Sequence, residues 1–269
     1  MRAINDQGYT NPTPIQQKAI PLILTGKDVV AGAQTGTGKT AGFTLPLLQR
    51  LSKTSNTKGK SPIRALIITP TRELAAQVNE SINKYGSHLP LKSKAIYGGV
   101  KINPQKAQLR MEVDILVSTP GRLRDHIGQN SVDLSKIEIL VLDEADRMLD
   151  MGFEPQIRSI AARLTCEGRQ TLFFTATWPK EVRAMASAYL RPNPIQITIG
   201  GSGEKLVANK DVAQSFVLVD GGEAGKPEAF AKVVADECGA SDSWSITERE
   251  LREGVCTHLP GATSLGGRH

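Results

Sequence analysis

A glycine-rich turn followed by a lysine and a threonine is the strongest chemical signal in this 269-residue sequence. It lies in the segment DVVAGAQTGTGKTAGF, residues 28–43. In the phosphate-binding template G-x-x-x-x-G-K-[ST], backbone N–H groups and the N-terminus of a helix face a phosphate. Lys39 would reach the β- and γ-phosphates, and the Thr40 hydroxyl would bind Mg²⁺. Ala33 stands where the template has its first glycine, which is acceptable if the backbone there needs no positive φ.

The surroundings of this turn decide between two interpretations. An apolar run precedes it and a helix-forming stretch follows it, which is the strand–loop–helix context that the template requires. The alternative is a glycine-rich turn that carries a lysine by chance, and this context disfavours it. The expected nucleotide-binding residues of the loop are Thr35, Gly36, Thr37, Gly38, Lys39 and Thr40.

Two adjacent carboxylates follow a second apolar run, in ILVLDEADRMLD at residues 139–150. Parallel sheets bind ligands at the carboxyl ends of their strands, so Asp143 and Glu144 are expected beside the phosphates. Asp143 is suited to Mg²⁺, directly or through water, and Glu144 to orienting and deprotonating an attacking water. The alternative is an ordinary acidic first turn of a helix. The predicted catalytic residues are Lys39, Asp143 and Glu144, with Thr40 and Asp143 at the metal.

Short apolar runs alternate with helix-like stretches along the chain, which indicates an α/β fold with a mostly parallel sheet covered by helices on both faces. ALIITP and ILVLDE are continuously apolar, as strands buried on both faces are. The predicted strands span residues 28–33, 64–69, 94–97, 114–118, 138–142, 171–175 and 195–199. The predicted helices span residues 40–51, 72–85, 122–127, 155–164 and 180–189.

Composition sets the broader class. A hydrophobic content of 39% and no apolar run of about 18 residues make a membrane span unexpected. No signal peptide is apparent, and three scattered cysteines suit a reducing compartment, so an intracellular protein, cytoplasmic or nuclear, is expected. A net charge of +6 is compatible with a polyanionic partner.

At this point the sequence resembles the DEAD-box RNA helicases, over roughly residues 8–199. GYTNPTPIQ, AQTGTGKT, PTRELAAQ, GG, TPGR, DEAD and TAT follow one another in the order that the family has them. Ala33 is also the residue with which the family begins its phosphate-binding loop. The resemblance implies a RecA-like lobe that uses ATP and Mg²⁺ and acts on RNA.

GYTNPTPIQ, residues 8–16, corresponds to the motif that reads adenine in the family. Thr13, Pro14 and Gln16 also form a helix start, with an N-cap, a proline at N1 and a glutamine at N3. The resemblance implies that Gln16 hydrogen-bonds the adenine edge and selects ATP over GTP, since an amide matches adjacent donors and acceptors. A capping role for Gln16 is the alternative.

PTREL, GG and TPGR look like the family's RNA-binding track, which contacts phosphates and 2′-OH groups without reading bases. Thr71 and Thr119 are also natural N-caps, and Arg122 has an internal salt bridge as its alternative role. The predicted RNA-binding residues are Thr71, Arg72, Gly98, Gly99, Thr119, Gly121 and Arg122.

TAT, residues 175–177, ends a predicted strand beside the carboxylates. In the family this segment couples the nucleotide state to closure of the lobes, so Thr175 and Thr177 are expected to act through Asp146. Local hydroxyl hydrogen bonds are the alternative and do not exclude coupling. His88 and His126 are expected at the surface, and Phe153 and Trp178 in packing contacts.

The family has two lobes, and the second one carries the arginine fingers. Residues 1–200 are expected to form the first lobe, residues 201–236 a linker and the start of an incomplete second lobe, and residues 237–269 a disordered tail. The chain alone, expected to be a monomer, should bind ATP weakly, hydrolyse it poorly and not unwind RNA. A P-loop ATPase acting on DNA and a non-catalytic RNA- or partner-binding fragment are the rival functions.

Overall fold

The computed structural model describes residues 2–34, 36–53 and 62–199, which all fall within one compact unit, Met1–Lys205. In this part of the chain a seven-stranded sheet has the order β3-β4-β2-β5-β6-β1-β7, and every pair of neighbouring strands is parallel. The predicted α/β class with a parallel sheet is therefore confirmed. The strands are β1 (Val29–Gly32), β2 (Ala65–Ile68), β3 (Ser93–Ile96), β4 (Ile115–Ser118), β5 (Ile139–Leu142), β6 (Gln170–Thr175) and β7 (Ile195–Thr198).

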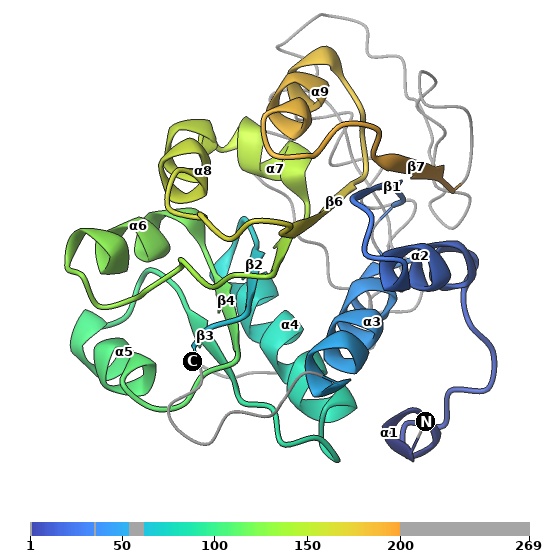
Figure 1. Cartoon of the computed structure of the whole chain (residues 1–269), viewed down its shortest axis with the longest axis horizontal. Helices are drawn as coiled ribbons and strands as arrows, with labels where there is room; N and C mark the ends of the chain where they lie inside the picture. Colours follow the sequence, from blue (N-terminus) through green and yellow to red (C-terminus); the bar gives the residue numbers. More distant parts are fainter. Residues whose placement is uncertain (1, 35, 54–61, 200–269) are drawn as a thin grey trace, which may run out of the picture. The chain divides into compact units, whose positions relative to one another are not determined.

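Helices cover both faces of the sheet (Figure 1). One face packs against α2 (Pro14–Leu24), α3 (Lys39–Lys53) and α4 (Arg72–Tyr85). The other packs against α5 (Ile102–Leu109), α6 (Pro120–Gly128), α7 (Ala145–Asp150), α8 (Glu154–Ala161) and α9 (Lys180–Ser187). A short helix, α1 (Arg2–Asn5), precedes α2 and contacts α4.

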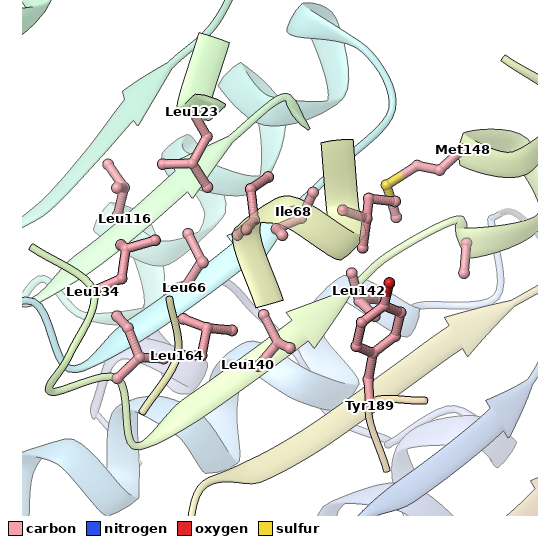
Figure 2. Packing of buried hydrophobic residues seen from close by; sticks show 14 of the residues in the cluster. Leu66, Ile68, Leu116, Leu123, Leu134, Leu140, Leu142, Met148, Leu164 and Tyr189 are labelled. Atoms are coloured by element: carbon pink, nitrogen blue, oxygen red, sulfur yellow. The ribbon is translucent and has the colours of Figure 1, made fainter. Parts of the chain in front are cut away.

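Alternation along each strand divides the interior into two cores. In β5, Ile139 and Val141 pack with α2–α4, while Leu140 and Leu142 pack with α5–α9. Both sets are buried, which explains why the strand reads as an uninterrupted apolar run. Burying one such side chain contributes about 1.5–3 kcal/mol relative to leaving it exposed. Figure 2 shows the second core, with Leu66, Ile68, Leu116, Leu123, Leu134, Leu140, Leu142, Met148, Leu164 and Tyr189.

The start of β1 is fixed to its neighbours by one buried carboxylate. Asp28 Oδ1 accepts from the Thr171 backbone N–H at 3.0 Å and from Arg191 Nη2 at 2.6 Å, and Oδ2 accepts from the Arg191 N–H at 2.7 Å. Because these bonds join β1 to the beginning of β6 and to the segment before β7, the loop that leaves the other end of β1 has a rigid base.

Strand order separates the predicted motifs into two groups along one edge of the sheet. The phosphate-binding turn, the Asp143–Glu144 pair and the 175–177 segment follow β1, β5 and β6, which are neighbours. The PTREL, GG and TPGR segments follow β2, β3 and β4, which are also neighbours. All leave the carboxyl ends of parallel strands, where α/β sheets bind ligands. The fold thus places the expected ATP residues on one half of this edge and the expected RNA residues on the other.

Sequence patterns predicted each strand to within one residue at either end and the five named helices to within three. They did not predict α5 because its eight residues carry no apolar stripe, since only Gln105 and Leu109 are buried. They also did not predict α7, whose six residues begin directly after the carboxylate pair. The predicted segments 201–236 and 237–269 lie outside the described residues.

Candidate functional site

The phosphate-binding turn joins β1 to α3 and requires its glycines. Gly36 and Gly38 have φ of +78° and +87°. A Cβ on Gly38 would lie 2.6 Å from Gln16 Nε2, so a side chain there would be both strained and blocked. Ala33 is buried, is not among the positive-φ residues, and donates its N–H to Thr175 O at 3.0 Å. Alanine therefore fits the first position of the motif. Thr35 lies outside the described residues.

Lys39 and Asp143 are both buried at this edge of the sheet and interact electrostatically. Lys39 is 6% exposed and Asp143 is 2% exposed. Burial raises the pKa of Asp143 to about 6, and the positive charge of Lys39 opposes that rise. Among the described residues, neither Lys39 Nζ nor Asp143 Oδ1 has a hydrogen-bond partner. Because buried charged groups are costly without partners, these two atoms are suited to a ligand that carries both anionic oxygens and a cation.

The register of the sheet explains this proximity. Leu142 in β5 is level with Phe173 in β6, and Phe173 is level with Val30 in β1. Asp143 therefore follows β5 at the same level as the turn that follows β1, with β6 between them. Two strand spacings of about 4.8 Å separate β5 from β1, so the turn and the Lys39 side chain together cover roughly 10 Å.

Glu144 has a backbone conformation that is rare for a side-chain-bearing residue. Its φ and ψ are 54° and 52°, the left-handed region, and it is the N-cap of α7. Such a conformation costs of order 1–3 kcal/mol and is concentrated at functional sites. The strained turn separates the buried Asp143 from the partly exposed Glu144, so adjacent carboxylates have different surroundings.

The predicted contact between Asp146 and the 175–177 segment is present. Asp146 Oδ2 accepts from the backbone N–H of Ala176 at 3.2 Å and of Thr177 at 2.9 Å. It also accepts from Thr177 Oγ1 at 2.9 Å. Thr175 Oγ1 donates to Thr177 O at 2.7 Å, which is the local bond that its alternative interpretation expected. The segment after β6 is thus tied to α7, directly beside the carboxylate pair.

Gln16 connects the start of α2 to the phosphate-binding turn. Its Oε1 accepts from the Thr13 N–H at 3.1 Å, as expected of a capping residue. Its Nε2 donates to Gly38 O at 3.2 Å. The amide oxygen has a second lone pair and the nitrogen a second hydrogen, so capping and adenine contact do not exclude each other.

The expected RNA-binding residues line the ends of β2, β3 and β4. Thr71 Oγ1 accepts from the Leu74 N–H at 3.2 Å, a cap that leaves the hydroxyl hydrogen available. Thr119 is also an N-cap, but its side chain makes no capping bond, contrary to expectation. Arg72 is exposed and pairs with Glu73, and a Cβ on Gly99 would lie 3.2 Å from Arg72 Nη1. No heavy atom lies within 4 Å of the corresponding position on Gly98 or Gly121.

Arg122 points inward. Its Nη2 donates to Val100 O at 2.8 Å and its Nη1 to Gln105 Oε1 at 3.1 Å. Its Nε lies 3.7 Å from Asp125 Oδ2, and the side chain is 11% exposed. These contacts favour the internal role that the sequence left open for Arg122 over a direct contact with RNA.

His126 is not at the surface, and that prediction was wrong. The side chain is fully buried, with Nδ1 2.8 Å from Ser131 Oγ and Nε2 3.4 Å from Gln105 Oε1. The position lies three residues after the buried Leu123, on the face that α6 turns to the core, and this spacing was the available signal. His88 is exposed as expected. Trp178 and Phe153 pack against the core as expected. The ring of Trp178 packs edge-on against that of Phe173, with 5.8 Å between the ring centroids.

Burial of His126 predicts a pH dependence of stability. Burial, followed by the positive charges of Arg122 and Lys106, lowers the pKa of His126, and Asp125 opposes this. Because the folded protein binds a proton at His126 less readily than the unfolded chain does, protonation favours unfolding. The contribution of neutral His126 to the stability of the fold is therefore complete above the unfolded pKa of about 6.5 and is lost as the pH falls below it. The free energy of unfolding should therefore fall more steeply from about pH 7.5 to about pH 5.5 in the wild type than in His126→Asn.

Urea denaturation at both pH values measures this difference, with His88→Asn as the exposed control. The raised pKa of Asp143 acts in the opposite direction. Its carboxyl binds a proton more readily in the folded protein than in the unfolded chain, so protonation of Asp143 stabilises the fold as the pH falls. That contribution is common to all three proteins and cancels. An equal pH dependence in wild type and His126→Asn would contradict the prediction.

Two further observations concern metals and membranes. Within residues 2–34, 36–53 and 62–199, no three His, Cys, Asp or Glu side chains are grouped as a metal site. Mg²⁺ typically takes only one or two carboxylates and completes its shell with phosphate oxygens and water, so Asp143 and Thr40 fit a metal brought with a nucleotide. No helix in the same residues is long and apolar enough to cross a bilayer.

The fold and this edge of the sheet define a P-loop α/β domain of the RecA-like type. The chain belongs to the DEAD/DEAH box helicase family, whose family model matches residues 13–185. It is 45% identical over 219 residues to the DEAD-box ATP-dependent RNA helicase 40 of Oryza sativa, covering 81% of this chain and 27% of that protein. It is 45% identical over 212 residues to the ATP-dependent RNA helicase DBP3 of Saccharomyces cerevisiae, covering 79% of this chain and 39% of that protein.

Among solved structures, the chain is similar to a hypothetical ATP-dependent RNA helicase from Sulfolobus tokodaii. The TM-score is 0.66 at 38% identity, and the match covers 74% of this chain and 56% of that one. The chain thus spans roughly a quarter to two fifths of the length of the two curated relatives named above.

Proposed function

We propose that this chain is the ATP-binding lobe of an ATP-dependent RNA helicase, in which ATP hydrolysis is coupled to destabilisation of RNA duplexes. The observation that carries the proposal is the electrostatic interaction of Lys39 with Asp143, two buried charged side chains that follow β1 and β5 on either side of β6. Among the described residues, Lys39 Nζ and Asp143 Oδ1 have no hydrogen-bond partner. Their charges are complementary to the phosphates and the metal of Mg²⁺·ATP.

Each residue at this edge has a distinct role in the proposed reaction. The backbone N–H groups of residues 36–38 and the N-terminus of α3 receive the phosphates, and Lys39 binds the β- and γ-phosphate oxygens. Asp143 and the Thr40 hydroxyl would hold Mg²⁺, which would supply positive charge beside the phosphates when bound. Glu144 orients the attacking water and accepts its proton.

Gln16 reads the adenine edge in this proposal. The free lone pair on its Oε1 and the free hydrogen on its Nε2 match the donor and acceptor of adenine. Its existing bond to Gly38 O supports this role, because the residue that recognises the base then also touches the loop that recognises the phosphates. Guanine presents the reverse order of donor and acceptor, so ATP is selected over GTP.

The RNA lies along the ends of β2, β3 and β4. Arg72 supplies an exposed positive charge beside Gly99, Thr71 supplies a hydroxyl, and Gly98 and Gly121 supply open backbone that a phosphate or ribose can approach. Thr119, the N-cap of α6, supplies a second hydroxyl for contact with the RNA backbone. Such contacts recognise the sugar-phosphate backbone, so they carry no base specificity. Arg122 supports this surface from within.

The Asp146–Thr177 contact joins the carboxylates after β5 to the segment after β6, within the half of the edge that holds the proposed ATP residues. The segment after β6 lies between the turn after β1 and the carboxylates after β5. A change at the γ-phosphate therefore reaches Asp146 through Glu144 and reaches the 175–177 segment through Asp146. We expect this route to couple the nucleotide state to closure against a second lobe.

Preference for RNA over DNA tests the proposed function. Fluorescence anisotropy with a labelled single-stranded RNA and the DNA of the same sequence, in Mg²⁺ and a non-hydrolysable ATP analogue, should show RNA bound at least about fivefold more tightly, because 2′-OH groups supply hydrogen bonds that DNA lacks. Arg72→Ala should weaken the binding of both. Equal or tighter binding of DNA would favour a DNA-acting ATPase. RNA binding that is unaffected by the nucleotide would favour a non-catalytic binding fragment.

A further inference from the structure

A glutamine outside all of the family motifs lies at the centre of the RNA-facing half of the edge. Gln105 is on α5 and only 5% exposed. Its Nε2 donates to Tyr97 O at 3.0 Å. Its Oε1 accepts from Arg122 Nη1 at 3.1 Å and lies 3.4 Å from His126 Nε2. A single buried amide thus joins the segment that leaves β3 to two residues of α6.

The contacts fix the orientation of this amide. The carbonyl of Tyr97 accepts only, so it requires Nε2, and the Arg122 guanidinium donates only, so it requires Oε1. His126 Nε2 lies 3.4 Å from Gln105 Oε1, to which a hydrogen on Nε2 would donate. His126 Nδ1 lies 2.8 Å from Ser131 Oγ, whose hydroxyl donates to the His126 backbone O at 3.0 Å.

The Gly98–Gly99 turn is held at both of its ends by this network. Gln105 binds the carbonyl of Tyr97, immediately before the turn, and Arg122 binds the carbonyl of Val100, immediately after it. Gly99 has φ of +81°, and adjacent glycines give the turn many accessible conformations. Two hydrogen bonds from a buried, interconnected pair therefore select one of them.

We propose that Gln105 is a positioning residue for RNA binding, which holds the Gly98–Gly99 turn in register with the first turn of α6 through Arg122. The inference rests on the proposed RNA-binding function of that edge. Gln105 itself touches no RNA. It acts by keeping the backbone at Gly98 and Gly99 and the backbone at Gly121 in a constant relative position, so that consecutive phosphates meet both.

Equilibrium binding of RNA by the full 269-residue chain tests the functional part. Gln105→Leu introduces an apolar side chain of similar volume and removes the contacts with Tyr97 O, Arg122 Nη1 and His126 Nε2. Affinity for single-stranded RNA should fall about 5- to 30-fold, the effect of losing one or two net hydrogen bonds. Affinity for a fluorescent ATP analogue should not change, because the β1, β5 and β6 half of the edge is untouched. Gln108→Leu, an exposed glutamine of the same helix, is the control and should behave as wild type.

Hydrogen exchange without RNA tests the positioning part independently. Amide exchange in residues 97–101 should accelerate in Gln105→Leu and not in Gln108→Leu, while the β5 and β6 amides keep their protection. If the exchange is unchanged, the inference is overturned whatever the RNA affinity. If exchange accelerates but RNA affinity stays at the wild-type value, the turn is held by Gln105 without consequence for RNA, and the inference is again overturned.

The same measurements separate this inference from the proposed function. Wild-type chain that binds no RNA contradicts the proposed function and the inference together. Wild-type chain that binds RNA, beside a Gln105→Leu variant that binds it equally well, contradicts the inference alone. A general loss of protection across the sheet in Gln105→Leu would mean a role in folding rather than in positioning, and would also overturn it.

Discussion

Hydrolysis of ATP by the 269-residue chain is expected to be about 10³–10⁵ times slower than in a two-lobed member of the family, the factor that an arginine finger contributes to phosphoryl transfer. The resemblance to the family places those arginines in the second lobe, and no motif similar to His-Arg-Ile-Gly-Arg occurs in these residues. In the proposed function Lys39, Asp143 and Glu144 bind and orient Mg²⁺·ATP, whereas the arginine fingers that the resemblance implies would come from a second lobe.

Phosphate release with saturating single-stranded RNA, measured beside a two-lobed relative under the same conditions, checks this expectation. The same chain should separate no RNA duplex, because half of an RNA track cannot bend a strand. Its affinity for an ATP analogue is the internal control, since binding should persist while turnover is lost. Turnover within about tenfold of the two-lobed relative would show that these residues already hold a complete catalytic site.

Replacement of Lys39 by alanine is expected to have the second largest effect. Removing one partner of a buried charged contact costs about 2–4 kcal/mol, so affinity for Mg²⁺·ATP should fall about 30- to 1,000-fold. Lys39 is buried, and among the described residues its Nζ has no hydrogen-bond partner. The substitution therefore removes no hydrogen bond of Nζ to those residues. Loss of its charge removes the opposition to the rise in the pKa of Asp143, which further weakens metal binding.

Isothermal titration with Mg²⁺ and a non-hydrolysable ATP analogue measures this loss. Lys53→Ala is a matched control, because Lys53 is at the exposed end of the same helix, α3. It should bind as the wild type does. An affinity for the analogue that is equal in Lys39→Ala and wild type would mean that the turn after β1 does not receive the phosphates.

The half of the edge that follows β1, β5 and β6 was largely predictable from the sequence, for a physical reason. Backbone recognition of phosphate needs glycines at fixed places, and Gly36 and Gly38 do have the positive φ that the pattern requires. Continuous apolar runs such as Ile139–Leu142 are decisive for buried parallel strands. Because the strands are parallel, the segments that follow them all lie at the same edge of the sheet. What the sequence did not show was the order of the strands, on which the division of this edge into two halves depends.

The residues that support the other half could not be predicted in the same way. Gln105 is a polar residue in a short helix without an apolar stripe, and its role depends on contacts with Tyr97 and Arg122 from other elements. His126 was predicted to lie at the surface, whereas the structure supplies it with two polar partners in a buried position. Arg122 was ambiguous in the sequence, since a guanidinium serves a phosphate and a carbonyl equally well. Such networks form only after the chain has folded.

A crystal structure of this chain with Mg²⁺ and a non-hydrolysable ATP analogue tests most directly whether Lys39, Asp143 and Glu144 serve one nucleotide. We expect Lys39 Nζ within hydrogen-bonding distance of a β- or γ-phosphate oxygen, with Asp143 beside the metal and Glu144 beside the γ-phosphate. An analogue that binds elsewhere, or one whose phosphates contact the turn after β1 while Asp143 and Glu144 point away from them, would contradict it.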